Sequence, residues 1–570
     1  MGIRFINRAL LILVFACAFR NIALFAQLPG NVGTVYLASS NNVKTVYWSD
    51  SPYYGSVILQ GAQSLSSTST WSNLATDDQF VSLNSFPATG GNAQFITNRL
   101  GQYAAVSWTP TNQQQFFRLS QPSMIPACCF AIFYNGLLEF SKCPAMIING
   151  RVHANGPIYM GTTASLTFND SVTTTSNLSA PFVDGLSSGW TPSNSNTWNV
   201  FYNGNPGCLA NTKGFNPADY HYMIEIPPAG ENPLSFTGRT RLYNHAQLVL
   251  LVTNSPSGTN PAVRLTVQAS IGGQVPGADF TPLSFYFTNA SPGLLSSNLP
   301  FLSLTNRFYD QREYKTNLVT QVDMGILAIW IWTNQAVKSK LPPTSGSYPN
   351  ILYVADQRNV TATQMPVVRL KNAAQLPYNP YGGTGIFGPF GFTVATLNPL
   401  YVWGNYNIQI DNSGNQSVAT TNTTNTVPAA LISDALTVLS SHWSDAVSFT
   451  STYATGNASY SATDGTTINA AIITGTMPST GFSATTYSGG VHNLPRLLED
   501  WSSKILWLNT SIIRLWDSQM ATNQFRNPAG FTPIPANPYY NPPTRRYSFD
   551  IHYLLPAYIP PGTPMLLSMP

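Results

Sequence analysis

The chain has 570 residues, of which 8% are charged, and its formal net charge is +4 at pH 7. So small a charge over this length leaves no basic patch for nucleic acid, which excludes that class of partner. A hydrophobic content of 43% excludes an intrinsically disordered chain. The length allows about two to four domains.

The first 26 residues have the pattern of a secretory signal peptide. Arg4 and Arg8 precede an apolar run over residues 9–19, and Ala26 precedes Gln27 at a plausible cleavage point. An uncleaved anchor and lipid attachment at Cys17 are the alternatives. We therefore expect an exported protein at the cell surface, in the extracellular medium or in the periplasm. No stable transmembrane segment is expected, since apolar runs such as residues 324–332 are too short.

Residues 27–122 predict a small β-sandwich-like module. Short β-rich runs are broken by Ser, Asn, Gly and Pro at the rhythm of a sandwich. Residues 115–119 read as its last strand and residues 121–123 as a linker.

From residue 123 onward the pattern predicts a larger, β-solenoid-like body, with a first half over 123–390 and a second half over 391–570. Strand-length apolar runs alternate with Asn-Gly turns at 135–136, 149–150 and 155–156. The fold class expected for the whole chain is therefore mainly β, with a few short helices.

Four cysteines follow the signal peptide: Cys128, Cys129, Cys143 and Cys208. Export permits disulfides. If Cys128 and Cys129 lie on a strand they point to opposite faces, so at most one pairs with Cys143. The alternative is that all four are small apolar core residues.

Two helices are expected within the body. Thr320 and Asp323 form a capping box ahead of apolar residues at helical spacing. The second helix spans 494–502, and its polar flank carries a structural ion cluster of Arg496, Glu499 and Asp500. Residues 504–516 return to strand character around a turn at 509–510, and a Pro-rich extended tail begins at Tyr539.

Several blocks in order resemble one family. They include FAIFYNGLLEF, NGRVHANGPIYM, FYDQREYKTNLVTQVDMGILAIWIW, GFTVATLNPLYVWGNYN and YSGGVHNLPRLLEDWSS. Over residues 128–565 the chain resembles the extracytoplasmic region of PilX-like, type IV pilus-associated assembly proteins, and residues 27–122 resemble a small β module of secreted bacterial proteins. The resemblance implies an exported structural component without assigned chemistry. One departure is that no acidic residue precedes Asp50, so the leader of a pilin is not matched.

Sequence motifs for catalysis are weak. GLSSG at 185–189 is followed by Trp-Thr-Pro instead of a helix, and GTGIFG at 383–388 lies between prolines. The six histidines are widely spaced, so no metal site is expected. Acids cluster around Glu313 and around Glu499, and in both places a neighbouring arginine favours an ion pair over a general acid.

The predicted function is an exported structural or adhesive cell-surface protein associated with type IV pilus or secretion machinery. We expect pilus or envelope components and glycans as partners, and no catalytic residue, metal or cofactor. The alternative is a polysaccharide-degrading β-solenoid enzyme or a glycan-binding protein. Aromatic residues near polar turns are the candidates for stacking on sugar rings: Trp190, Trp198, Tyr202, Trp403 and Tyr406.

Overall fold

The computed structural model describes seven strands between residues 35 and 120 and most of residues 124–568. The segments outside the description within that second range are 142, 162–165, 177, 180–196, 203–207, 210–216, 234, 257, 270–280, 342–347, 378–390, 410–413, 415, 451–464, 481–486, 524 and 526–538. The chain divides into two units. One comprises Met1–Met124, Glu231–Arg239 and Ile271–Asp279, and the other comprises Ile125–Gly230, Thr240–Ser270 and Phe280–Pro570.

The first unit contains two antiparallel sheets. One has the order β1-β2-β6-β5 and the other β4-β3-β7. The strands are β1 (Val35–Ser40), β2 (Val43–Ser49), β3 (Ile58–Ala62), β4 (Ser72–Thr76), β5 (Ile96–Leu100), β6 (Tyr103–Trp108) and β7 (Phe116–Ser120).

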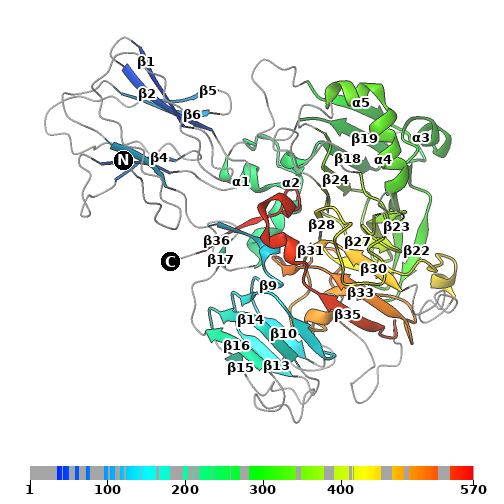
Figure 1. Cartoon of the computed structure of the whole chain (residues 1–570). Helices are drawn as coiled ribbons and strands as arrows, with labels where there is room; N and C mark the ends of the chain where they lie inside the picture. The colour runs from blue at the N-terminus through cyan, green and yellow to red at the C-terminus, as the bar shows by residue number, and fades with distance from the viewer. Residues whose placement is uncertain are drawn as a thin grey trace. The chain divides into compact units, whose positions relative to one another are not determined.

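The second unit is built from parallel ladders (Figure 1). The first ladder runs β24 (Ile351–Asp356), β26 (Phe392–Thr396), β28 (Ala429–Ser433), β31 (Ala471–Thr474), β34 (Ile512–Arg514), β9 (Ile132–Tyr134), β12 (Val152–Ala154) and β14 (Leu166–Thr174). The second runs β23 (Lys315–Asp323), β25 (Gln364–Lys371), β27 (Leu400–Trp403), β29 (Leu436–Leu439) and β32 (Pro495–Leu497). Two short ladders hold β30 (Thr466–Asn469), β33 (Ile505–Asn509) and β35 (Thr544–Ser548), and β10 (Leu138–Ser141), β13 (Ile158–Gly161) and β15 (Leu178–Ser179).

Successive coils of the chain thus add strands to stacked ladders, which is the arrangement of a β-solenoid. The expected mainly β class is confirmed. The order of coils differs from the order of the chain, because β9, the first ladder strand in sequence, pairs with β34 near the end. Ile132 lies opposite Ile512, and Tyr134 opposite Arg514. The solenoid is therefore completed in its middle by two segments that are far apart in sequence.

Antiparallel strands and helices cover one end of the solenoid. β18 (Leu248–Thr253) pairs in parallel with β24. The sheet then continues with antiparallel pairs from β18 to β19 (Ala262–Val267) and from β19 to β20 (Leu283–Phe287). The helices α3 (Pro292–Asn298), α4 (Met324–Thr333) and α5 (Gln335–Lys340) lie at this end (Figure 1). Trp330 of α4 packs edge-to-face against Phe285 and Phe301.

From β24 to β12 the first ladder is buried on both faces. In β24, Leu352 and Val354 belong to one hydrophobic core and Ile351, Tyr353 and Ala355 to a second. Because neighbouring residues of a strand point to opposite faces, such a strand reads as a continuous apolar run.

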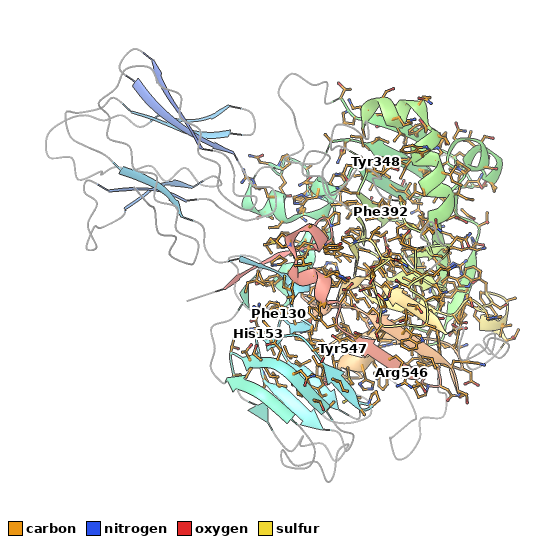
Figure 2. All side chains as sticks on the ribbon, viewed as in Figure 1. Phe130, His153, Tyr348, Phe392, Arg546 and Tyr547 are labelled. Carbon is orange, nitrogen blue, oxygen red and sulfur yellow. The ribbon has the colours of Figure 1, made fainter. Side chains whose placement is uncertain are left out.

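Polar ladders mark the turns between coils. The side chain of Asn155 donates to that of Asn135 at 3.0 Å, and the two asparagines are one coil, or 20 residues, apart. His153 bonds Thr173 at the same spacing, at 2.7 Å, and its ring packs beside Phe130 (Figure 2). The Asn-Gly turns that predicted stacked coils therefore hold the coils together through their asparagines.

Two local predictions need correction. The expected helix over 494–502 is wrong: Val491–Asn493 forms a short 3₁₀ turn, and Pro495–Leu497 is strand β32. Pairing with β29 overrides the apolar spacing that suggested a helix. The helix after Thr320 is present as α4, but its N-cap is Asp323, whose side chain accepts from the amide of Ile326. Thr320 lies in β23 and donates to Asp356.

Candidate functional site

One line of mostly buried polar side chains crosses the second ladder. We call it the polar row, and the strand register places its members opposite one another: Gln321, Arg369, Tyr401, Thr437 and Arg496. Strand alternation places their neighbours in each strand on the opposite face of the sheet. Three members of the row are bound by carboxylates: Asp310 and Glu313 lie just before β23, and Asp445 follows β29.

Arg496, at one end of the row, is paired with Glu313 from the turn between β22 (Arg307–Asp310) and β23. Its Nη1 lies 2.8 Å from Oε1 of Glu313, and its Nη2 donates to the carbonyl of Ala521. The other Glu313 oxygen accepts from the amide of Asn523 at 3.0 Å. Burial raises the pKa of Glu313, and Arg496 opposes that rise. The pair therefore fastens the segment around residue 521 to the sheet.

Tyr401, in the middle of the row, donates its hydroxyl to Oδ2 of Asp310 at 2.5 Å. The other Asp310 oxygen accepts from the backbone amides of Arg312 and Glu313. Burial raises the pKa of Tyr401 well above its ordinary value, and the adjacent Asp310 adds to this effect. Tyr401 is thus a neutral hydrogen-bond donor that fixes the turn carrying Glu313.

Arg369 is bound on two sides. Nη1 and Nη2 contact the two oxygens of Asp445 at 2.5 and 3.0 Å, and Nε and Nη2 donate to Oε1 of Gln321. Its guanidinium lies 4.8 Å from the ring centre of Trp403, as does the ammonium of Lys371. A bidentate pair of this kind combines strength with a fixed geometry.

Asp434 directly follows β28 and lies at the centre of a second cluster of buried polar groups. Its carboxylate accepts from the amides of Gln519, Met520 and Ala521, the shortest contact being 2.5 Å. His221 Nε2 also contacts it, at 3.1 Å, while Nδ1 contacts Glu225 at 2.9 Å. Burial alone would lower the pKa of His221, but the two carboxylates outweigh it and raise the pKa. Since both ring nitrogens are engaged, this arrangement suits anchoring better than proton transfer to a substrate.

The three residues expected to form one ion cluster have separate partners. Arg496 binds Glu313, whereas Glu499 accepts from the amide and hydroxyl of Ser440 at 2.6 and 2.7 Å. Asp500 accepts from the amide of Ser502 and the side chain of Asn541. The predicted cluster depended on helical spacing, and the extended backbone separates its members instead. The two acid-rich segments noted in the sequence are joined to each other through Arg496 and Glu313.

The aromatic residues expected to stack on sugars have different outcomes. Trp190 lies outside the described residues, as do the side chains of Trp198 and Tyr202. Tyr406 is fully buried, so its assignment to a stacking surface is wrong. Trp403 is partly exposed beside its two cations.

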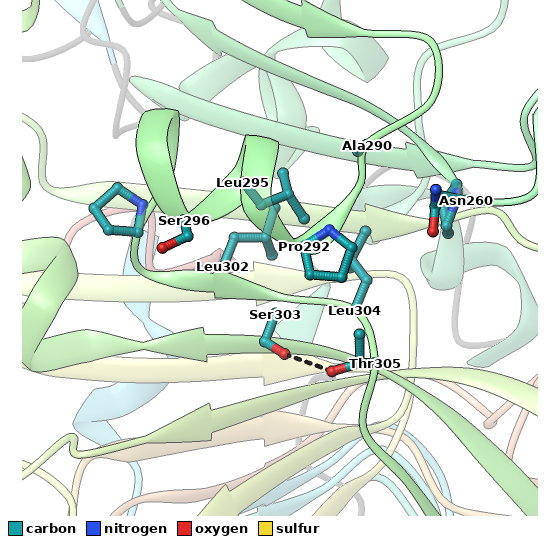
Figure 3. A pocket seen from close by; sticks show the side chains of 11 residues that line it. Asn260, Ala290, Pro292, Leu295, Ser296, Leu302, Ser303, Leu304 and Thr305 are labelled. Carbon is teal, nitrogen blue, oxygen red and sulfur yellow. Dashed lines mark hydrogen bonds between the residues drawn. The ribbon is translucent and has the colours of Figure 1, made fainter.

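Other sequence motifs and cavities add little chemistry. The segments 185–189 and 383–388 lie outside the description. Across the described ranges no three His, Cys, Asp or Glu side chains gather as a metal site would require, and no helix there could span a bilayer. A cavity of about 240 Å³ beside α3 is lined by apolar, amide and hydroxyl side chains, and the nearby side chains of Ser303 and Thr305 are bonded to each other at 3.3 Å (Figure 3).

No family model, curated protein or solved structure matches the chain. The polar row therefore has to be interpreted from its own geometry. Sequence reasoning found Arg496, Glu313 and Asp310 but not Asp434 and Asp445. Asp434 interrupts two buried apolar strands, and an acid in such a place is the signal that could have identified it.

Proposed function

We propose that the protein is an exported structural or adhesive component of the cell surface, associated with type IV pilus or secretion machinery. The signal-peptide pattern of residues 1–26 supports export. The resemblance of residues 128–565 to PilX-like proteins supports the association with envelope machinery.

The polar row is the observation that carries the structural part of this proposal. Its arginines and tyrosine bind Glu313, Asp445 and Asp310, carboxylates that lie just before β23 or after β29. Removing either partner of a buried pair leaves an uncompensated charge or donor, so each pair favours one position of its segment against the sheet. A solenoid fastened in this way suits a rigid scaffold.

Localisation in the native host tests the proposal. Sheared surface fibres, outer membrane, periplasm and culture medium are separated, and the N-terminal peptide in each fraction is identified by mass spectrometry. We expect a chain beginning at Gln27 in the fibre or outer-membrane fraction. A chain that retains Met1 and stays in the cytoplasm would contradict export, and a chain confined to the medium or periplasm would contradict a surface role.

Glycan binding is a second candidate, favoured by Trp403. The indole is partly exposed, and Lys371 beside it supplies a cation that suits an acidic sugar. Binding to immobilised acidic and neutral polysaccharides is compared for the wild type, Trp403→Ala and Trp332→Ala. Trp332 is a matched control because it is 41% exposed and also lies near a lysine. We expect only Trp403→Ala to lose binding to acidic glycans, and equal binding by all three proteins would overturn this assignment.

The degrading-enzyme alternative needs two carboxylates that face a common substrate. Glu499 is fully buried against Ser440, while Asp500 lies at the surface with Asn541. These two acids do not suit that task as a pair. Incubation of the protein with the glycans above, followed by analysis of released reducing ends, tests the alternative directly.

A further inference from the structure

Two adjacent cysteines directly precede β9, which lies in the middle of the first ladder. Cys128 and Cys129 belong to the 3₁₀ turn Ala127–Cys129, directly before β9, and both are free thiols. We expected the two cysteines to point to opposite faces only if they lay on a strand, and they lie in a turn instead. In the turn their thiols are hydrogen-bond partners of each other.

The two thiols differ in access and in environment. Cys128 is fully buried, whereas Cys129 is partly exposed and donates to the carbonyl of Tyr553 at 3.2 Å. Burial raises the pKa of Cys128 well above its ordinary value. The bond to Cys128 and the nearby Arg151 lower the pKa of Cys129. Cys129 is therefore the thiol that reacts first with a reagent from solvent.

We propose that Cys128 and Cys129 form a redox site that a low-molecular-weight disulfide converts into a disulfide between the two neighbours. The Cys129 thiolate attacks the reagent, forming a mixed disulfide and releasing one thiol. The Cys128 sulfur then attacks Cys129, releases the second thiol and passes its proton to that leaving group. The protein loses two electrons and two protons, and one molecule of the small disulfide is reduced to two thiols.

The short distance between neighbouring residues should make this disulfide easy to reduce. Consecutive Cα atoms are about 3.8 Å apart, below the range of about 4.4 to 6.8 Å usual for disulfides. The bond is therefore strained, and strained disulfides are easily reduced. Oxidation also removes the hydrogen that Cys129 donates to Tyr553, so it breaks a contact with η8 (Ile551–Leu554) in the C-terminal segment. This inference does not depend on the proposed cell-surface role.

Peptide mapping of the full-length protein tests the site. Reduced protein is treated with oxidised glutathione, alkylated and digested with trypsin. Cleavage after Lys142 gives the peptide 119–142, which contains Cys128 and Cys129 but not Cys143. We expect this peptide to lack two hydrogens, to carry no alkyl group and no partner peptide, and to revert with dithiothreitol.

Three results would overturn the proposal. They are alkylation of both cysteines after treatment, a link to a peptide that contains Cys143 or Cys208, and a glutathione adduct on Cys129 that persists in the wild type. Such an adduct is expected only in Cys128→Ala, which lacks the second thiol. Cys143→Ser serves as the control that keeps the reaction.

A second reagent tests the proximity of the two thiols in the wild type itself. Phenylarsine oxide bridges two thiols that lie close together, with release of water. We expect one arsenical bound at peptide 119–142 in reduced wild type and none in Cys129→Ser. Absence of the arsenical from the wild-type peptide would contradict the proximity on which the site depends.

Discussion

The guanidinium of Arg496 lies 2.8 Å from the carboxylate of Glu313, a residue 183 positions earlier in the chain. Both side chains are buried, with exposed fractions of 3% and 2%. We expect Glu313→Gln to lower the free energy of unfolding by about 3–5 kcal/mol, because Arg496 is left as an uncompensated buried cation. Urea denaturation followed by tryptophan fluorescence measures this loss.

The same substitution at Glu225 is the control. Its side chain is 41% exposed and bonds His221, so Glu225→Gln is expected to cost about 1 kcal/mol or less. The double variant Glu313→Leu with Arg496→Met should lose less than the sum of the single changes, since it leaves no unpaired charge. A strictly additive result would mean that the two residues are not coupled.

We expect Glu499 to make the stability of the protein depend on pH. Burial raises its pKa to about 7, although the two bonds from Ser440 oppose the rise. Its unfolded pKa is about 4.3, so the native state binds the additional proton between these two values. The resulting stability is complete below about pH 4 and is lost as the pH rises through 7, by a total on the order of 3 kcal/mol. Unfolding in urea from pH 5 to pH 8 should show this decline in the wild type and a flatter profile in Glu499→Gln. Parallel profiles for the two proteins would show that Glu499 does not titrate in this range.

Asn135 joins the coil that contains β9 to the neighbouring coil that contains β34, which is far away in sequence. Its side chain donates to the carbonyl of Leu515 at 3.0 Å and accepts from Asn155. We expect Asn135→Ala to cost about 1–3 kcal/mol, because buried polar partners lose their bonds. The rate of backbone amide hydrogen exchange should also rise in β9 and β34. Asn169→Ala removes an exposed member of a similar ladder, and its effect should stay within about 0.5 kcal/mol. Equal exchange in both variants would contradict a role of Asn135 in joining the coils.

Gly391 precedes β26 with a φ of 119°, and an added Cβ would lie 2.1 Å from the carbonyl oxygen of Pro428. We expect Gly391→Ala to cost at least about 2 kcal/mol, from backbone strain and from the clash. Gly414 has a φ of 80° with open space around it, so Gly414→Ala isolates the backbone contribution. Thermal unfolding of the two variants compares them, and a similar drop in both would show that the clash is relieved.

Local patterns predicted the repeating architecture. The Asn-Gly turns at 135 and 155 indicated stacked coils, and residues 504–516 indicated the two strands now seen as β33 and β34. The helix predicted at 494–502 is wrong: residues 494, 497, 498 and 501 fit a helical stripe, but Pro495–Leu497 pairs with β29 as a strand. The partner of Arg496 and the pairing of β9 with β34 were not predictable, since contacts over such distances leave no signal in one sequence.

The position of β9 between β34 and β12 also has a consequence during synthesis. Ile132 and its partner Ile512 are separated by 380 residues. At a ribosomal rate of about 5–20 residues per second, the partner strand follows after roughly twenty seconds to over a minute. Throughout that interval one edge of β9 has no strand to pair with, and an unpaired apolar edge is a template for aggregation. Delivery of the nascent chain to a holding chaperone would shield this edge until β34 has been made.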